Sequence, residues 1–158
     1  MEPPELDDVD RGILHMLQAD ARNNTASVIA EAVGVAPNTV RNRIERLEDD
    51  GVINGYQPDI DYDAAGFQLR VQLVCTVSIG DRAGLVEEAL GIDGVVEVEE
   101  IHAGTENLVV EAVAGDGDDI TRIAANLEAL GLAVQTQRFV KNVHVQPFDH
   151  FGSDVSEE

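Results

Sequence analysis

Residues 29–48 read IAEAVGVAPNTVRNRIERLE, and this stretch decides the fold of the first third of the chain. Gly34 divides it into two helical segments, and Pro37 stands in the first turn of the second, where a helix tolerates proline. Ala30 offers a small side chain where two helices touch, and Val40 is an apolar residue that fills the angle between them. This spacing predicts a helix-turn-helix, whose second helix enters the major groove of DNA.

The predicted reading helix, residues 37–49, has one apolar stripe and one polar face. Val40, Ile44 and Leu47 recur at i, i+4 and i+7 and must face the other helices. The opposite face offers amide, hydroxyl and guanidinium groups, which recognise base edges and phosphate oxygens. The alternative is an amphipathic helix that does not bind DNA and whose charged face is only solvated. We predict that the DNA-binding residues are Asn38, Thr39, Arg41, Asn42, Arg43 and Arg46.

Two further helices precede the reading helix. The first is expected from about residue 9 to 19, and Asp7 or Asp8 can cap it by accepting bonds from free N–H groups of the first turn. The second is expected between the cap Thr25 and the turn at Gly34. Both carry apolar residues at helical spacing, so the three helices can share one small core.

A short extended segment follows the helices. Residues 52–56, after Gly51, are typical of a small hairpin or wing. Residues 1–56 are therefore predicted to form a winged helix-turn-helix domain that binds DNA. Residues 57–66, which contain several Asp and one Pro, are predicted to be a linker.

The second half of the chain changes from helical periodicity to alternation, which predicts strands. From Phe67 to Ile79 every second residue is apolar, and the residues between them are mostly polar. The Gly104-Thr105-Glu106 stretch later in the chain has the length of a hairpin turn. The predicted order is strand, helix, strand, strand, helix, strand, at residues 67–79, 81–90, 95–103, 107–114, 118–130 and 132–146, with a bulge near Arg138.

This βαββαβ order predicts a ferredoxin-like domain at residues 67–147, and the whole chain is α+β. In this arrangement both helices cover one face of a four-stranded antiparallel sheet and leave the other face open. The first strand shows Gln68, Arg70 and Gln72 on the open face, a pattern that suits a second copy of the chain. We expect a homodimer or a higher homo-oligomer. Residues 148–158 are predicted to be an acidic tail.

The charge balance is unusual for a DNA-binding protein. The 158 residues hold 31 Asp and Glu against 10 Lys and Arg, a net charge of −21, and Lys141 is the single lysine. Such an excess repels phosphates in dilute buffer, but the Debye length falls to about 3 Å at 1 M salt. The composition is typical of proteins from halophilic archaea; the alternative is an acidic mesophile protein. One cysteine and no apolar run of membrane-spanning length favour a cytoplasmic protein without membrane contact.

Three stretches resemble the Lrp/AsnC family of feast/famine transcription regulators: LDDVDRGIL at residues 6–14, the helix-turn-helix at 29–48, and GVINGY at 51–56. The resemblance extends over about residues 6–146. It implies a regulator whose winged helix-turn-helix binds double-stranded promoter DNA as a dimer. It also implies that the ferredoxin-like half assembles dimers into larger rings and senses a small-molecule effector, often an amino acid.

The resemblance also implies where an effector binds. Family members commonly hold it where the hairpin after the second strand of the domain meets a neighbouring subunit. The family often has Gly followed shortly by Asp at this turn, whereas this chain continues with other residues, of which Glu106 could hold an α-amino group. The implied effector-binding residues are His102, Gly104, Thr105, Glu106 and Asn107.

Other functions have fewer residues in their favour. A decarboxylase of the haem pathway, which shares this layout, would depend chiefly on His102 and Arg70, and a stand-alone sensor would not bind DNA. A metal site from His144, Asp149 and His150 is conceivable, but nothing else has ligand spacing. We predict no enzyme activity, no catalytic residues, no metal and no cofactor.

Overall fold

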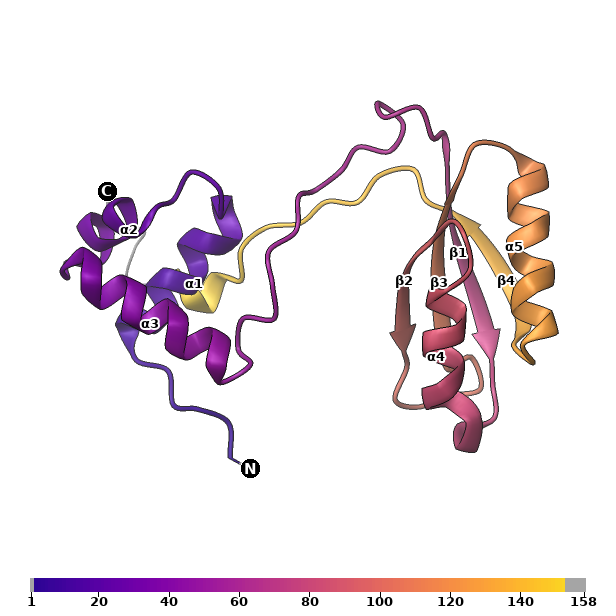
Figure 1. The fold of residues 1–158 in the computed structure, drawn as a ribbon, viewed down its shortest axis with the longest axis horizontal. Coiled ribbons are helices and arrows are strands. Elements are labelled where there is room, and N and C mark those ends of the chain that lie inside the picture. Colours follow the sequence, from indigo (N-terminus) through magenta and orange to yellow (C-terminus); the bar gives the residue numbers. More distant parts are fainter. Residues whose placement is uncertain (1, 153–158) are drawn as a thin grey trace. The chain divides into compact units, whose positions relative to one another are not determined.

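The computed structural model describes residues 2–152 of the chain, which form two compact units (Figure 1). One unit contains the described residues up to Pro58 together with those from His144 onward. The other contains the residues from Asp59 to Val143. The chain therefore leaves the first unit, builds the second, and returns to the first.

The first unit holds three helices with the predicted starts. Helix α1 spans Asp8–Asp20, α2 spans Ala26–Val33 and α3 spans Pro37–Asp49. Asp7 caps α1 by accepting from the Asp10 N–H at 2.9 Å, and Thr25 caps α2 by accepting from the Val28 N–H at 3.3 Å. The capping side chains that the sequence predicts are confirmed, since each satisfies a backbone donor that the first turn leaves free.

The three helices share one small core. It is built from the apolar stripes of all three helices, with no aromatic residue among its fully buried members. Burial of aliphatic side chains is the main favourable term in folding, and a core this small limits the stability of the unit. The buried residues are Ile13, Leu14, Ile29, Ala30, Val40 and Leu47.

The segment after α3 does not form the predicted hairpin. Residues 52–58 contain no strand, and Val52 and Ile53 both donate their N–H groups to the Leu47 carbonyl, at 2.9 and 3.0 Å. Both side chains are half-buried against the helical core. The backbone donors that a hairpin would need are thus used to close the C-terminal end of α3, as in a Schellman-type cap.

The predicted acidic tail differs from the structure in its first residues. A short 3-10 helix, η2 at Asp149–Phe151, packs on α1, and the Phe151 side chain lies against the helical core. The Phe148 N–H donates to the Gln18 side-chain oxygen at 3.1 Å. Apolar contact thus anchors residues 148–152 to the first unit. Residues 153–158 lie outside the described part of the chain.

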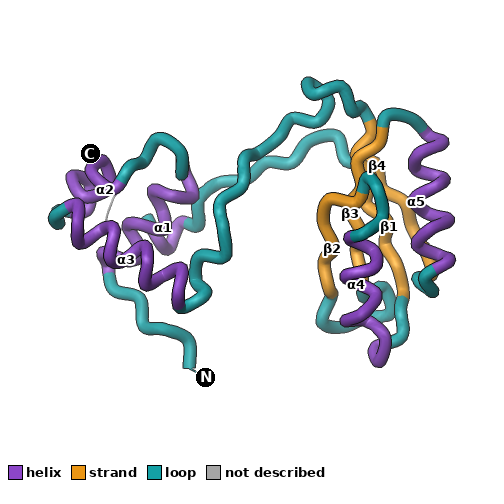
Figure 2. The backbone as a smooth tube through the Cα atoms, viewed as in Figure 1, coloured by secondary structure: helices purple, strands orange, loops and turns teal. Residues whose placement is uncertain are grey.

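The second unit has the predicted ferredoxin-like order (Figure 2). Its sheet has the strand order β2-β3-β1-β4, and all neighbouring strands are antiparallel. A short 3-10 helix, η1 at Ile79–Asp81, follows the first strand. The elements are β1 at Leu69–Thr76, α4 at Arg82–Leu90, β2 at Val95–Glu100, β3 at Leu108–Ala114, α5 at Gly117–Ala129 and β4 at Ala133–Phe139.

Both helices of this unit cover the same face of the sheet. Ala89 of α4 and Ile123 and Leu127 of α5 join the inward residues of the strands in one buried cluster. The inward residues of β1 alternate along the strand, as the sequence predicts, and include Val71 and Leu73. The opposite face, which we call the open face, has no helix over it within the described residues of this unit.

Several strand ends differ from the sequence prediction: β1 begins at Leu69 instead of Phe67, and β2 ends at Glu100 instead of Ala103. β1 ends at Thr76, because Ile79 has turned out into η1 and is 78% exposed. β4 ends at Phe139, seven residues before the predicted end. Its bulge lies where Val74 pairs with Thr136 and Cys75 pairs with Val134, so the extra residue precedes Thr136 and is not near Arg138.

Candidate nucleic-acid interface

The turn between α2 and α3 sets the direction of the reading helix. Gly34 has a φ of 76°, in the left-handed region that glycine adopts without steric cost. Its N–H donates to the Ala30 carbonyl at 2.9 Å, and the Val35 N–H donates to the same carbonyl at 3.1 Å. Ala30 is buried, so its small side chain allows α2 and α3 to approach closely.

Helix α3 buries its apolar stripe and exposes the opposite side. Val40 and Leu47 are 0% and 1% exposed. Asn38, Arg41 and Asn42 are exposed near the N-terminal end of the helix. In helix-turn-helix proteins this end of the second helix contacts base edges, and here it carries exposed polar side chains.

Two of these residues are already in contact. Arg41 donates from Nη1 to the Asn38 side-chain oxygen at 2.9 Å, one helical turn away. Thr39, between them in sequence, is half-buried. The contact holds a guanidinium and an amide side by side on the exposed face, and both groups can recognise base edges.

The structure places Arg43 and Arg46 against α1 instead of leaving them free on the polar face. Arg43 donates from Nη1 to Asp7 at 2.6 Å and to Asp10 at 3.1 Å. Arg46 donates from Nη2 to both oxygens of Asp10, at 3.0 and 2.8 Å. The two arginines and two aspartates form one ion cluster that ties the middle of α3 to the start of α1.

The charges of this cluster compensate one another. The Asp10 backbone N–H and the Arg43 guanidinium lower the pKa of Asp7 to about 2. The Asp7 and Asp10 carboxylates in turn raise the pKa of Arg43 above its usual value. Asp10 is 0% exposed, and a buried carboxylate is tolerable only when it is paired and hydrogen-bonded. The charges of Arg43 and Arg46 are thus largely compensated by carboxylates of the same domain.

The sequence contained a signal for this cluster that residue-type reasoning missed. Asp10 lies three residues before Ile13, on the apolar stripe of α1, where a charged side chain needs an ionic partner. Arg43 and Arg46 are themselves three residues apart on one side of α3. The i, i+3 spacing of two arginines could have indicated a shared carboxylate as well as a DNA contact.

The hairpin predicted to hold the effector is an exposed loop between β2 and β3. It is closed by a bond from the Ile101 N–H to the Asn107 carbonyl at 2.9 Å. Gly104 has a φ of 110°, which only glycine adopts easily. The structure brings together, on the solvent side of this loop, His102, Gly104, Thr105 and Glu106.

Asn107 is separated from the other hairpin residues by its burial. Its side-chain oxygen accepts from the Val77 N–H at 2.9 Å, and its side-chain nitrogen donates to the Val77 carbonyl at 2.8 Å. Its backbone N–H donates to the Cys75 carbonyl at 3.0 Å. The Asn107 amide therefore pairs with backbone that would otherwise be unsatisfied where β1 ends, and it is not directed to solvent.

Arg70 and His102, the residues of the decarboxylase alternative, lie at opposite ends of the sheet. Arg70 pairs with Val113 at the end of β3, whereas the loop with His102 precedes Leu108 at its start. The Arg70 guanidinium forms an ion pair with Glu111. These two residues therefore cannot share one substrate pocket.

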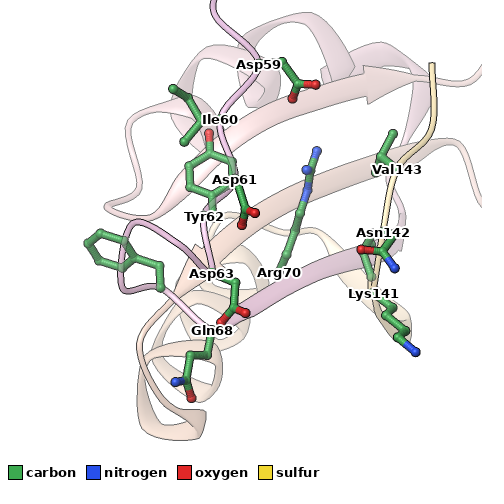
Figure 3. Close-up of a pocket in the computed structure, with 12 residues that line it drawn as sticks. Asp59, Ile60, Asp61, Tyr62, Asp63, Gln68, Arg70, Lys141, Asn142 and Val143 are labelled. Atoms are coloured by element: carbon green, nitrogen blue, oxygen red, sulfur yellow. The ribbon is translucent and has the colours of Figure 1, made fainter. Parts of the chain in front are cut away.

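Arg70 also lines a groove of about 360 Å³ within the second unit (Figure 3). The groove lies between residues 59–63, the start of β1 and residues 140–143. The Arg70 guanidinium carbon is 5.7 Å from the centre of the Tyr62 ring, a cation–π distance. Its partners, Glu111 and Tyr62, thus come from the same unit.

The remaining candidate groups have ordinary structural roles. Burial raises the pKa of the Cys75 thiol to about 11, so it is not a thiolate at neutral pH. Among residues 2–152, no group of three or more His, Cys, Asp or Glu side chains is arranged to hold a metal ion. No helix in this described part is both long and apolar enough to cross a membrane.

Comparison with known proteins agrees with this geometry. Residues 6–54 match a family model described as winged helix-turn-helix DNA-binding. The transcriptional regulator AldR of Mycobacterium tuberculosis is 34% identical over 134 residues, which cover 82% of this chain and 73% of AldR. The crystal structure of M. tuberculosis AldR has a TM-score of 0.74 at 31% identity, over 90% of this chain and 99% of that one.

A third similarity concerns the fold alone. A feast or famine regulatory protein from M. tuberculosis, crystallised in complex with L-methionine, has a TM-score of 0.78 at 24% identity, over 90% of this chain and 96% of that one. Its likeness extends over both units. The ferredoxin-like half of the chain is thus shared with known structures as well as the helix-turn-helix.

The fold and the exposed face of α3 define a helix-turn-helix transcription regulator that binds DNA. Within that class, the chain belongs to the Lrp/AsnC family of feast/famine regulators. The relatives are transcription regulators, which confirms the prediction of a regulator and not an enzyme.

Proposed function

We propose that this protein reads promoter DNA with the N-terminal end of α3, chiefly through Asn38, Arg41 and Asn42. The observation that carries this proposal is that the α3 arginines differ in their hydrogen-bond partners. Arg41 contacts only the neutral Asn38 side chain among the described residues, whereas Arg43 and Arg46 are bound to carboxylates. A guanidinium without a carboxylate partner is the one that can exchange its contact for a guanine or a phosphate at least cost.

The proposal includes a cytoplasm rich in salt, as in a halophilic archaeon. A net charge of −21 would oppose approach to DNA in dilute buffer. Molar salt screens this repulsion but also weakens counterion release, which drives most protein–DNA association. Binding must then depend on short-range hydrogen bonds and apolar contact, for which the exposed amides of Asn38 and Asn42 are suited.

The proposal also includes a small-molecule effector, with amino acids as the class to test first. A protein of the same fold was crystallised with L-methionine. In this chain the exposed loop at residues 102–106 carries one carboxylate, Glu106, which can hold an α-amino group. A homodimer or higher oligomer, formed through the open face of the sheet, would bring a second subunit's surface to complete such a site.

A binding assay on the full chain tests the DNA proposal. DNA selected from a random pool by repeated binding in about 2 M KCl supplies the operator. Arg41→Ala and Asn42→Ala should each weaken binding by about 1 to 3 kcal/mol, the usual worth of a base contact. Arg22→Ala is the matched control, because Arg22 is an exposed arginine of the same domain that lies after α1.

The salt dependence gives a second readout. Each phosphate contact steepens the fall of log affinity with log salt by about 0.9. We expect a slope well below that of a basic regulator with about six to ten phosphate contacts. If both α3 variants bind DNA like the parent, the exposed face of α3 does not recognise DNA. A steep slope would refute the account of binding at high salt.

A further inference from the structure

The two carboxylates of the ion cluster between α1 and α3 differ in burial. Asp10 is 0% exposed, and Arg46 donates to both of its oxygens. The Asp7 side chain is 52% exposed and accepts from Arg43. One arginine charge is thus sufficient to compensate the buried carboxylate, and the charge of the other arginine is compensated by an exposed one.

The two oxygens of Asp7 have separate contacts. Oδ1 accepts from the Asp10 N–H at 2.9 Å and caps α1, whereas Oδ2 accepts from Arg43 Nη1 at 2.6 Å. A helix cap requires only a hydrogen-bond acceptor, and the neutral side chains of serine and asparagine provide one as well. The cap therefore does not require the negative charge of Asp7, and that charge acts chiefly on Arg43.

Arg43 lies at the border of the DNA-reading face of α3. Residues four apart on a helix are neighbours, so Arg43 follows Thr39 and Arg46 follows Asn42 along the helix surface. The Arg43 side chain is 27% exposed, and that of Arg46 is half exposed. Arginines beside a reading helix commonly contact phosphate oxygens of the DNA backbone, which fixes the helix in the groove. Arg43 is in a position to make such a contact.

A DNA phosphate and Asp7 would compete for the same guanidinium. If Arg43 gave up Asp10, a buried carboxylate would lose one of its partners, which is strongly unfavourable. If it gave up Asp7, an exposed carboxylate would return to water, while Asp10 would keep Arg46 and the Asp7 backbone N–H. The contact with Asp7 is therefore the one that a phosphate oxygen can replace.

We propose that Arg43 contacts a DNA phosphate and that Asp7 competes for this contact within the chain, so that Asp7 lowers the affinity of the protein for DNA. The inference rests on the DNA binding by α3 in the proposed function and adds a backbone contact to the base contacts named there. Bound DNA displaces Oδ2 of Asp7 from Arg43, while Oδ1 still caps α1.

This exchange also bears on the salt dependence of binding. A phosphate that is neutralised by an arginine releases a condensed cation, which steepens the fall of affinity with salt. The Asp7 carboxylate, once it has lost Arg43, attracts a cation from the salt in return. The two effects largely cancel, so the Arg43 contact adds little to the slope in the parent chain.

Asp7→Ser in the full chain tests the competition, because serine caps a helix but is too short to reach Arg43. The affinity for the selected DNA is measured in about 0.5 M and about 2 M KCl. Asp7→Ser should bind about sixfold more tightly than the parent in the lower salt and about twofold more tightly in the higher salt. Its log affinity should then fall with log salt more steeply than that of the parent by about 0.8, close to the value for one phosphate contact.

Two comparisons separate this competition from a general effect of charge. Glu5→Gln removes one negative charge from an exposed side chain two residues earlier and should leave the affinity within about 1.5-fold of the parent, because exposed charges are screened at these salt concentrations. Arg43→Gln removes the shared donor, so Asp7→Ser should give no gain when it is added to Arg43→Gln. Circular dichroism checks the fold of each variant. Asp7→Asn replaces Asp7→Ser, and Arg43→Met replaces Arg43→Gln, if either fails to fold.

The outcomes distinguish this inference from the proposed function. If Asp7→Ser folds like the parent but binds DNA equally or more weakly, Asp7 does not compete with DNA, although DNA binding by α3 stands. A gain that Glu5→Gln matches, or one that persists without Arg43, would overturn the inference in the same way, because it would arise from the overall charge. If the parent chain selects no DNA from the random pool, the proposed function fails and this inference fails with it.

Discussion

Arg46 of α3 donates to both carboxylate oxygens of Asp10 of α1, at 3.0 and 2.8 Å, and Asp10 is completely buried. Arg43 joins the same carboxylate at 3.1 Å. The reading helix is thus fixed to the first helix by charge as well as by apolar packing. A change at Asp10 is therefore expected to act on the stability of the domain and on the orientation of its DNA-binding face.

Asp10→Ala should lower the free energy of unfolding of the helix-turn-helix unit by about 2 to 3 kcal/mol. Breaking a buried ion pair leaves the other charges uncompensated, and the half-exposed position of Arg46 moderates the cost. Thermal unfolding followed by circular dichroism measures the change. Asp49→Ala, at the exposed end of α3, is the control and should lie within about 0.5 kcal/mol of the parent. Equal stability of the two variants would show that the cluster does not hold α1 to α3.

Asp7 should make the stability of this unit depend on acid pH. Its pKa in the folded chain is lowered from 3.8 to about 2 by the Asp10 N–H and by Arg43. A carboxyl whose pKa is lowered by folding stabilises the protein above its unfolded pKa and loses that contribution as pH falls through the folded one. We expect the stabilisation to disappear between pH 3.8 and about 2.

Asp7→Asn isolates this effect, because asparagine also caps helices but does not ionise. The free energy of unfolding, measured with denaturant through this pH range, should fall less steeply with decreasing pH for Asp7→Asn than for the parent. Glu5→Gln, an exposed change in the same segment, should leave the parent slope unchanged. Identical slopes for Asp7→Asn and the parent would contradict the role assigned to Asp7.

The helix-turn-helix could be predicted from sequence because its determinants are local. Gly34, Pro37 and Thr25 act on the backbone within one turn of themselves, and the structure has the turn and the helix starts at these residues. The alternation from Leu69 to Cys75 is likewise local and set the buried face of β1. Such features can be predicted without knowing where distant parts of the chain lie.

The features that the sequence did not predict depend on contacts between residues far apart in the chain. Among residues 2–152, Arg43 has a carboxylate partner and Arg41 has none, and the position of α1 decides which arginine is paired. The family resemblance implies that Asn107 binds the effector, yet its side-chain amide is bound to Val77, 30 residues earlier. Phe151 belongs to a segment that sequence composition describes as a tail, but it reaches the helical core.

Asn107→Ala should therefore change stability more than effector response. Two side-chain hydrogen bonds to Val77 are lost and two backbone groups are left unsatisfied, which costs about 2 to 3 kcal/mol. Glu106→Ala, at the exposed neighbouring position, should leave stability near the parent value and reduce any effector response. Thermal unfolding, together with DNA binding measured with and without amino acids, compares the two. If Asn107→Ala instead changes the effector response and leaves stability near the parent value, Asn107 is an effector-binding residue.

The packing of the C-terminal segment on α1 depends on Gly152. A Cβ at this position would lie 2.7 Å from two atoms of the His15 ring, closer than side-chain atoms approach one another. Gly152→Ala should therefore push residues 148–152 away from α1, since the His15 ring is half-buried on the helix and cannot move freely. The Phe151 side chain would then leave the helical core, at a cost of about 1 to 3 kcal/mol.

Hydrogen exchange measures this displacement where it occurs. The amides of Phe151 and Gly152 donate to the Phe148 and Asp149 carbonyls, at 3.1 and 2.9 Å, and should lose protection in Gly152→Ala. Gly55→Ala is the control, because a Cβ there meets nothing within 4 Å and such a change is neutral or slightly stabilising. His15→Ala combined with Gly152→Ala should restore part of the protection, because it removes the ring that causes the clash. Unchanged protection in Gly152→Ala alone would mean that this segment is held by its apolar contacts without close approach to His15.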